Sequence, residues 1–237
     1  MKCTIPYTLM GILSVLFLLG FATLRSSRAR LSGIQIATDT TAGTRFFNRA
    51  EIEGILRSHA VQVQKPLQAL NLGKIEREVG DLPYVAEAQT YISVGGQLKV
   101  VVRQKTALAR IHNAKGDYYL TDTGGQMPLS PDYAADVILV QGEFTASDLQ
   151  DLKALVKALQ QRSFLSQFII GIQLRGKDYV LFTRSGAHRI IFGRAQRIDE
   201  KLNKLITFYK KVLNPRGWAT YRLVNLKYRD QVICTKS

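Results

Sequence analysis

The sequence predicts an α+β protein with three parts: an apolar N-terminal helix, a small unit of order strand–helix–helix–strand–strand, and a larger, mostly antiparallel β-domain with flanking helices. Three observations support this class. An uncharged run opens the chain, capping and periodicity signals mark the helices, and alternating strands are separated by glycine turns. No low-complexity linker divides the two folded units.

The N-terminal segment has the length of a membrane span. From Cys3 to Leu24 the chain carries no charged residue, and Arg25 follows at once. As a helix, this run would extend roughly 33 Å, enough to cross a bilayer core of about 30 Å. We expect residues 1–4 to form a short cytoplasmic tail and residues 5–24 to be a transmembrane helix that leaves the bulk of the chain outside the cytoplasm.

A cleaved signal peptide is the alternative for this segment. Lys2 would be its basic start, Leu9–Leu19 its apolar centre and Gly20-Phe21-Ala22 its cleavage site. The length of the apolar run and the arginines that follow it favour the uncleaved anchor. Those arginines also oppose the expected orientation under the positive-inside rule, although long soluble domains translocate regardless of such local bias.

The first folded unit begins with a strand and a helix. Residues 33–37 alternate as a short strand. Asn48 is a helix N-cap, with Glu51 three residues later as its capping-box partner and Phe47 as part of a hydrophobic staple. We expect this helix to end near His59.

A second helix and a hairpin complete the unit. Apolar residues between Leu72 and Val79 recur at helical spacing, and Gly80 is the expected stop. A strand over residues 85–94 follows, then the turn signal Gly95-Gly96 and a partner strand over residues 98–103. Two helices on one face of a small sheet would bury the apolar sides of these elements.

The second unit is predicted to contain seven strands and two helices. One helix starts at a cap formed by Thr145 and Asp148, and the other runs from about Gln196 to Leu213. The predicted strands are Tyr118–Leu120, Val137–Val140, Ile169–Leu174, Tyr179–Thr183, His188–Phe192, Tyr221–Leu226 and Gln231–Cys234.

Positive charge is concentrated in the C-terminal third of the chain. Residues 171–237 carry 15 basic and 4 acidic side chains, a balance of +11, whereas residues 32–170 balance to zero. This third is expected to attract a negatively charged protein partner or lipid headgroups, unless it is simply a solvated basic helix face. Nucleic acid is disfavoured because the chain carries no basic-aromatic binding motif.

The sequence contains no recognisable catalytic or metal site. His59, His112 and His188 lie in different elements, and no ligand spacing links them. Asp122 is expected to stabilise a turn, and Cys234 has no histidine base near it in sequence. No P-loop, dinucleotide fingerprint or nucleophile elbow occurs. We therefore expect a protein that is not an enzyme and holds no cofactor, metal or small-molecule substrate.

Two groups of motifs together resemble one family. The segments Ile75-Glu76-x-x-Val79, Leu82-Pro83-Tyr84-Val85-x-x-Ala88 and Leu98-x-Val100-x-Val102 resemble the end of a POTRA domain, here residues 31–105. The segments Tyr119-Leu120-x-Asp122-x-Gly124, Met127-Pro128-Leu129 and Leu226-Lys227-Tyr228 resemble the β-domain that follows POTRA in the FtsQ/DivIB cell-division proteins, here residues 106–237.

The resemblance implies a non-enzymatic, single-span scaffold of the bacterial inner (plasma) membrane at the division septum. Family members bind the small coiled-coil proteins FtsB and FtsL outside the cytoplasm, contact other septal proteins and support septal wall synthesis. Carried over to this chain, the partner-binding residues are Tyr228, Arg229, Asp230, Gln231, Val232 and Ile233, with the basic residues Arg194, Arg197, Lys201 and Lys204 beside them.

The residues themselves lead to the same surface. A strand close to the chain end has little after it to cover its edge, and an open edge accepts an added strand. The basic region beside it would favour an acidic segment. For Tyr228 the alternative is an aromatic half-buried on the sheet.

Two other functions remain open. A POTRA-bearing envelope protein could handle outer-membrane or secreted polypeptides by strand addition, although neither a barrel domain nor POTRA repeats are visible. A cell-wall enzyme is the third reading, and it has no candidate residues.

Overall fold

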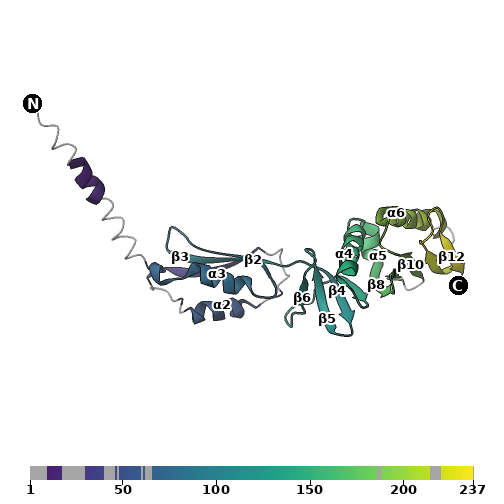
Figure 1. Cartoon of the computed structure of the whole chain (residues 1–237), viewed down its shortest axis with the longest axis horizontal. Coiled ribbons are helices and arrows are strands. Elements are labelled where there is room, and N and C mark those ends of the chain that lie inside the picture. The colour runs from purple at the N-terminus through teal and green to yellow at the C-terminus, as the bar shows by residue number, and fades with distance from the viewer. Residues whose placement is uncertain are drawn as a thin grey trace, which may run out of the picture. The chain divides into compact units, whose positions relative to one another are not determined.

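The structure is a computed structural model, and it describes residues 10–17, 30–39, 46, 48–59, 61, 66–185, 188–213 and 220–236. The chain folds into two compact units, residues 1–104 and 105–237 (Figure 1). Residues 10–17 are helical. No helix within the described ranges is long and apolar enough to cross a membrane. The rest of the predicted span 5–24 lies outside the described residues, so the membrane anchor stays a prediction.

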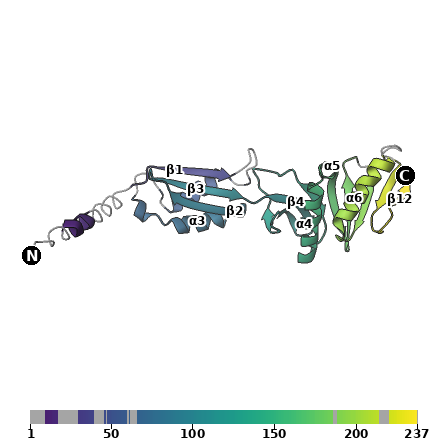
Figure 2. The same cartoon turned by 90° about the horizontal axis from the view of Figure 1, so that it is seen from above.

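The first unit has the predicted order of strand, two helices and a hairpin. Its elements are β1 (Gly33–Asp39), α2 (Arg49–Ser58), η1 (Leu67–Ala69), α3 (Leu72–Gly80), β2 (Val85–Ile92) and β3 (Gln97–Gln104). The sheet order is β1-β3-β2, with β1 parallel and β2 antiparallel to β3. Both helices lie beside this sheet in Figure 1, and the perpendicular view in Figure 2 shows α3 along one side of it.

Amphipathic spacing explains how the first unit packs. Alternate residues of β3 are fully buried, as are the inward residues of α3, so the helices cover one face of the sheet. The buried residues on these elements are Ile52, Leu56, Ile75, Val79, Leu98, Val100 and Val102.

Two local predictions for the first unit need correction. Asn48 is the N-cap of α2, but its side chain accepts from the Ala50 amide rather than from that of Glu51. The hairpin turn begins earlier than expected, because the Gly96 amide donates to the Ser93 carbonyl oxygen at 2.9 Å. Val94 is therefore fully exposed in the turn and not part of the strand. Phe47 lies outside the described residues.

The second unit is built on a nine-stranded mixed sheet. Its strands are β4 (Ala107–Asn113), β5 (Gly116–Thr121), β6 (Gln126–Pro128), β7 (Ile138–Gln141), β8 (Ile169–Arg175), β9 (Asp178–Thr183), β10 (Arg189–Gly193), β11 (Tyr221–Asn225) and β12 (Ile233–Lys236). Its helices are α4 (Ala146–Gln160), α5 (Ser163–Phe168) and α6 (Ile198–Phe208), and a π-helical turn η2 (Tyr209–Leu213) extends α6. The order is β12-β11-β10-β9-β8-β7-β4-β5-β6.

The second sheet has five antiparallel and three parallel strand pairs between described residues. Two of the parallel pairs follow from helical crossovers, because a helix returns the chain to the same end of the sheet. The helices α4 and α5 connect β7 to β8, and α6 connects β10 to β11. The α+β class is confirmed. The strands β4 and β6 and the helix α5 were not predicted.

One core joins the helices to one face of this sheet. Buried residues of α4, α5 and α6 belong to the same cluster as alternate residues of the central strands, such as Val140, Ile172, Leu181 and Ile190. On the opposite face, Leu139 is 51% exposed. The helix α6 therefore lies on the covered face, beside the last three strands of the sheet.

The cap of α4 predicts a pH-dependent stability. The Thr145 hydroxyl and backbone amide both donate to Asp148, whose amide donates back to the hydroxyl, and these bonds hold the pKa of Asp148 below its usual value. We expect Asp148→Ala to lower the free energy of unfolding by about 1 kcal/mol at pH 7. The contribution of a carboxylate with a lowered pKa is present above the unfolded value of about 3.9 and is lost below the folded one.

Urea unfolding at pH 7 and at about pH 2 measures this effect. The difference between parent and variant should shrink at the lower pH. Asp151→Ala removes a carboxylate from the next turn of α4 without touching the cap, so it should show a smaller effect at pH 7. Equal losses from the two variants would contradict the capping argument.

Candidate functional site

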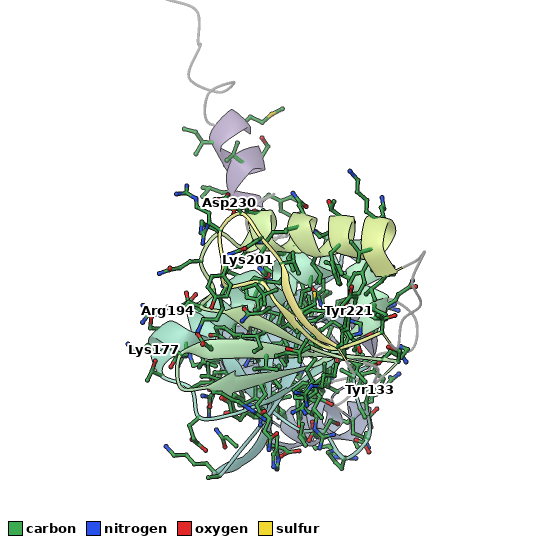
Figure 3. The ribbon with its side chains drawn as sticks, turned by 90° about the vertical axis from the view of Figure 1, so that its right-hand side faces the viewer. Tyr133, Lys177, Arg194, Lys201, Tyr221 and Asp230 are labelled. Atoms are coloured by element: carbon green, nitrogen blue, oxygen red, sulfur yellow. The ribbon has the colours of Figure 1, made fainter. Side chains whose placement is uncertain are left out.

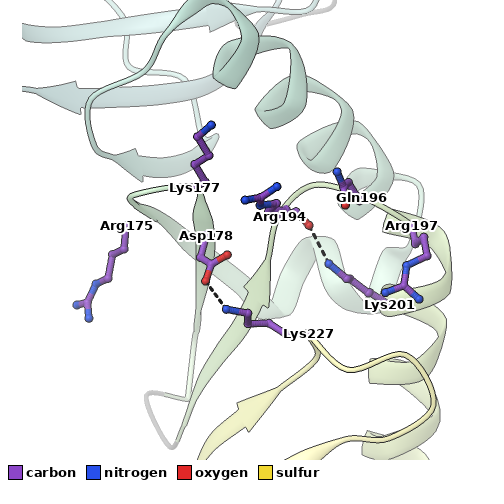
Figure 4. Close-up of a pocket in the computed structure, with 8 residues that line it drawn as sticks. All are labelled: Arg175, Lys177, Asp178, Arg194, Gln196, Arg197, Lys201 and Lys227. Carbon is purple, nitrogen blue, oxygen red and sulfur yellow. Dashed lines mark hydrogen bonds and ion pairs between the residues drawn. The ribbon is translucent and has the colours of Figure 1, made fainter.

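Side chains from four segments form a basic pocket at one end of the central strands. Its volume is about 430 Å³, and six of its eight lining residues are cationic (Figure 4). The segments are the β8–β9 turn, the end of β10, the start of α6 and the residue pair after β11. The lining residues are Arg175, Lys177, Asp178, Arg194, Gln196, Arg197, Lys201 and Lys227.

Most of the positive charge in this pocket is not neutralised by neighbours. Lys227 Nζ lies 2.7 Å from the Asp178 carboxylate, and Arg197 pairs with Glu200 outside the lining set at 3.2 Å. Arg175, Lys177 and Arg194 form no ion pair with a described carboxylate. In Figure 4 the Lys177 side chain extends away from the Asp178–Lys227 pair. The pocket therefore favours an anionic ligand.

The β10–α6 connection that shapes the pocket uses two left-handed residues. Gly193 has φ +76°, and a Cβ there would lie 2.8 Å from Lys227 Cγ. Arg197, the N-cap of α6, has φ +52° and is the one described residue other than glycine in this region of φ. Such a conformation costs an L-residue about 1–2 kcal/mol. The surrounding contacts must hold it in place.

Lys201 lies at the base of the pocket and is 4% exposed. Its ammonium donates to the Phe192 carbonyl oxygen at 3.0 Å and to that of Arg194 at 2.8 Å, and it lies 4.7 Å from the centre of the Phe192 ring. Burial, and then the nearby Arg197 and Lys204 charges, lower the pKa of Lys201. The charge of Lys201 is thus directed into the protein rather than into solvent.

An apolar groove lies between α6 and the last two strands. Its volume is about 680 Å³, and its lining residues are Lys204, Thr207, Phe208, Lys211, Val212, Tyr221, Val232 and Cys234. Figure 3 shows Tyr221 on one side of the β-domain and Arg194 and Lys177 on the other, so the groove and the basic pocket are separate features around α6. Burial raises the pKa of the Cys234 thiol, which disfavours a reactive thiolate there.

The outermost strand β12 borders this groove. It begins at Ile233, two residues later than predicted, because Tyr228–Asp230 form a bend. No described strand pairs with its outer side. Tyr228 is 48% exposed and Ile233 42% exposed, so both side chains remain accessible to a partner.

The predicted partner-binding residues divide into three groups. Arg194, Arg197 and Lys201 line the basic pocket, and Lys204 and Val232 line the apolar groove. The remaining predicted residues lie in the bend or begin β12, and these are Tyr228, Arg229, Asp230, Gln231 and Ile233.

The residues predicted from the sequence leave out five of the eight that line the basic pocket and six of the eight that line the apolar groove. Arg175 and Lys177, at the β8–β9 turn, enter the basic pocket because β9 lies next to β10. Lys227 enters it because β11 lies on the other side of β10. The run Arg175-Gly176-Lys177-Asp178 lies between two predicted strands, and its three charges are the signal that could have marked it.

Each of the three histidines contacts the carboxylate or hydroxyl group of another side chain. His59 lies 2.8 Å from Glu78, and the His188 ring contacts the Tyr209 hydroxyl at 2.7 Å. His112 and Arg110 both contact Asp117, and these contacts lower the pKa of that carboxyl. The described residues contain no cluster of three or more metal-ligating side chains.

Comparisons with known proteins identify both units. A family model described as FtsQ/DivIB, C-terminal related, matches residues 106–235, and one described as a POTRA-like domain matches residues 31–103. Among solved structures, the chain is similar to the major extracytoplasmic domain of the trans isomer of the cell division protein DivIB from Geobacillus stearothermophilus. That likeness has a TM-score of 0.35 and 9% identity, and it covers 47% of this chain and 96% of the other. The comparison with curated proteins gives no match.

Proposed function

The chain belongs to the FtsQ/DivIB family of bacterial cell-division proteins, and from this premise we propose that it is a non-enzymatic scaffold of the division machinery. It binds single-span coiled-coil partners of the FtsB and FtsL type outside the cytoplasm and supports septal wall synthesis. Residues 5–24 span the inner membrane, residues 1–4 remain in the cytoplasm, and the POTRA domain (31–105) and β-domain (106–237) lie outside it at the septum.

The observation that carries the binding proposal is the outer side of β12, which pairs with no other strand in the part of the chain that the structure describes. An extended segment of the partner adds to this strand through backbone hydrogen bonds. Its side chains on the α6 side enter the apolar groove beside Val232, and acidic side chains of the partner reach the basic pocket around Arg194. Main-chain pairing then supplies affinity, and the groove and pocket supply specificity.

A second edge in the molecule is less suited to strand addition. β2 is an edge strand of the POTRA-like unit, but its Thr90 amide donates to the Glu76 carboxylate of α3 at 2.7 Å. A strand added there would have to displace this bond. The alternative function is a POTRA-type envelope protein that handles other polypeptides by strand addition at β2. This bond makes strand addition at β2 less favoured than strand addition at β12.

Localisation in growing cells tests the scaffold proposal. A fluorescently tagged full chain should form a ring at mid-cell as constriction begins. An even distribution around the envelope would overturn the division role and favour the POTRA-type envelope protein instead.

Site-specific photo-crosslinking tests the surface. A photoreactive residue at Tyr228 or Ile233 should yield an adduct with an FtsB-like protein. The matched control is Tyr91, which is 45% exposed on β2 of the other unit and should give no such adduct. Crosslinks from Tyr91 but not from the β12 region would reject the proposed edge.

A further inference from the structure

We propose that Lys201 and Lys204 are positioning residues: they fix two backbone segments beside α6 and are not themselves ligands of the partner. This inference rests on the proposed function for its consequence in binding. The claim that the two ammonium groups hold these backbone segments in place does not depend on the proposed function.

The first contact holds the end of β10. Lys201 donates to the carbonyl oxygens of Phe192 and Arg194, and the Gln196 amide donates to the same Arg194 carbonyl oxygen at 2.8 Å. These bonds close the connection that contains the left-handed residues Gly193 and Arg197. They thereby set the direction from which the exposed Arg194 side chain enters the basic pocket.

The second contact holds the bend before β12. Lys204 Nζ donates to the carbonyl oxygen of Tyr228 and, at 3.1 Å, to that of Arg229. Tyr228 and Arg229 are both exposed, so this bend has few side-chain contacts to order it. The ammonium of Lys204 replaces them with a charge-assisted bond to the main chain.

The two contacts come from one rigid element. Lys201 and Lys204 are three residues apart on α6, so they lie on neighbouring positions of one helix face. α6 therefore sets the separation between the segment 192–194, which shapes the pocket, and the segment 228–230, which leads into β12. A partner that spans both would meet a surface ordered in advance, which lowers the entropic cost of binding.

This assignment divides the cations into two roles. Arg194, Lys177 and Arg175 line the pocket and form no ion pair with a described carboxylate, so they are available to a ligand. The Lys201 ammonium already donates two hydrogen bonds inward and is nearly fully buried. Removing the hydrogen-bond donors of Lys201 should therefore disturb the conformation of the backbone that they hold. Removing the ammonium of Lys177 should only lower the positive charge of the pocket.

Four variants of the full chain separate these roles. Lys201→Met and Lys204→Met keep an apolar stem but remove the donors. Lys201→Gln is neutral but retains two N–H donors. Lys177→Met is the matched control, because Lys177 lines the same pocket but its ammonium donates to no carbonyl oxygen of the described residues. Hydrogen exchange followed by mass spectrometry reports the backbone, and titration with a poly-L-glutamate peptide at low salt reports the pocket.

We expect Lys201→Met to speed exchange in residues 194–197 about tenfold, and Lys204→Met to do the same in residues 228–232. Lys177→Met should leave both segments unchanged. Affinity for poly-L-glutamate should fall about tenfold in Lys201→Met and only about threefold in Lys201→Gln. Unchanged exchange in both methionine variants would overturn the proposal, as would equal losses of affinity in Lys201→Gln and Lys201→Met.

The two measurements can fail separately. If the parent chain did not bind poly-L-glutamate, the acidic-ligand part of the proposed function would be wrong. The exchange data would still decide whether the two lysines hold the segments. If exchange rose while affinity stayed at the parent level, the lysines would order the backbone without positioning the binding surface, and the inference would fail.

Discussion

Replacing Val232 by glutamate is expected to lower the affinity of the chain for an FtsB-like partner by about 30-fold, equivalent to about 2 kcal/mol. Val232 is half-buried, packs against the core of the β-domain and lines the apolar groove beside β12. A carboxylate there would occupy the groove and lose hydration when a partner strand covers it. It would also repel the acidic side chains that the neighbouring lysines favour.

Titration of purified variants with the extracytoplasmic segment of the partner measures this effect. Val232→Leu, which keeps an apolar side chain in the groove, should bind within a few-fold of the parent. Leu139→Glu makes the same kind of change at a residue of β7 that is 51% exposed, and it should bind as the parent does. If Val232→Glu stayed folded and bound as tightly as the parent, strand addition at β12 would be the wrong mechanism.

Replacing Gly193 by alanine is expected to lower the free energy of unfolding by about 2–3 kcal/mol. The backbone there has φ +76°, which an L-residue adopts only at a cost. The added Cβ would also lie 2.8 Å from Lys227 Cγ. Lys227 would have to move, and its ion pair with Asp178 would weaken.

Gly176→Ala provides the matched control in urea unfolding. Gly176 has φ +62°, and a Cβ there would meet no atom within 4 Å. This variant isolates the backbone cost, which we expect to be about 1 kcal/mol. The excess in Gly193→Ala then measures the contact with Lys227. Equal losses in the two variants would show that the close approach of Lys227 contributes nothing.

Local signals explain which parts of the fold could be predicted from the sequence. The cap at Thr145 and Asp148 and the glycine at the end of α3 act within a few residues of chain, and both helices form where they indicate. β4 was missed because part of its burial depends on β7, which does not follow it directly in the chain. The helix α5 has 6 residues, too few to show a clear helical period in the sequence. β4 lies between β5 and β7, and α5 packs beside α4 and β8.

The candidate site was predicted only in part for the same reason. An excess of basic residues marked α6 and the segment before it, and the chain order placed β12 last. The contribution of Arg175 and Lys177 depends on β9 lying next to β10, which residue patterns do not reveal. The burial of Lys201 was also missed, because a lysine in a basic run ordinarily lies in solvent.

The parallel pairing of β1 with β3 has a mechanical consequence. Gly33 of β1 lies opposite Gln97 of β3, and the pairing continues to Asp39 opposite Arg103. Tension along the chain would enter this unit at the start of β1 and leave it at the end of β3, so it would pull two neighbouring parallel strands in opposite directions. All of their ladder hydrogen bonds would then bear the load in shear together instead of opening one after another. A unit with this geometry resists stretching between the N-terminal segment and the β-domain.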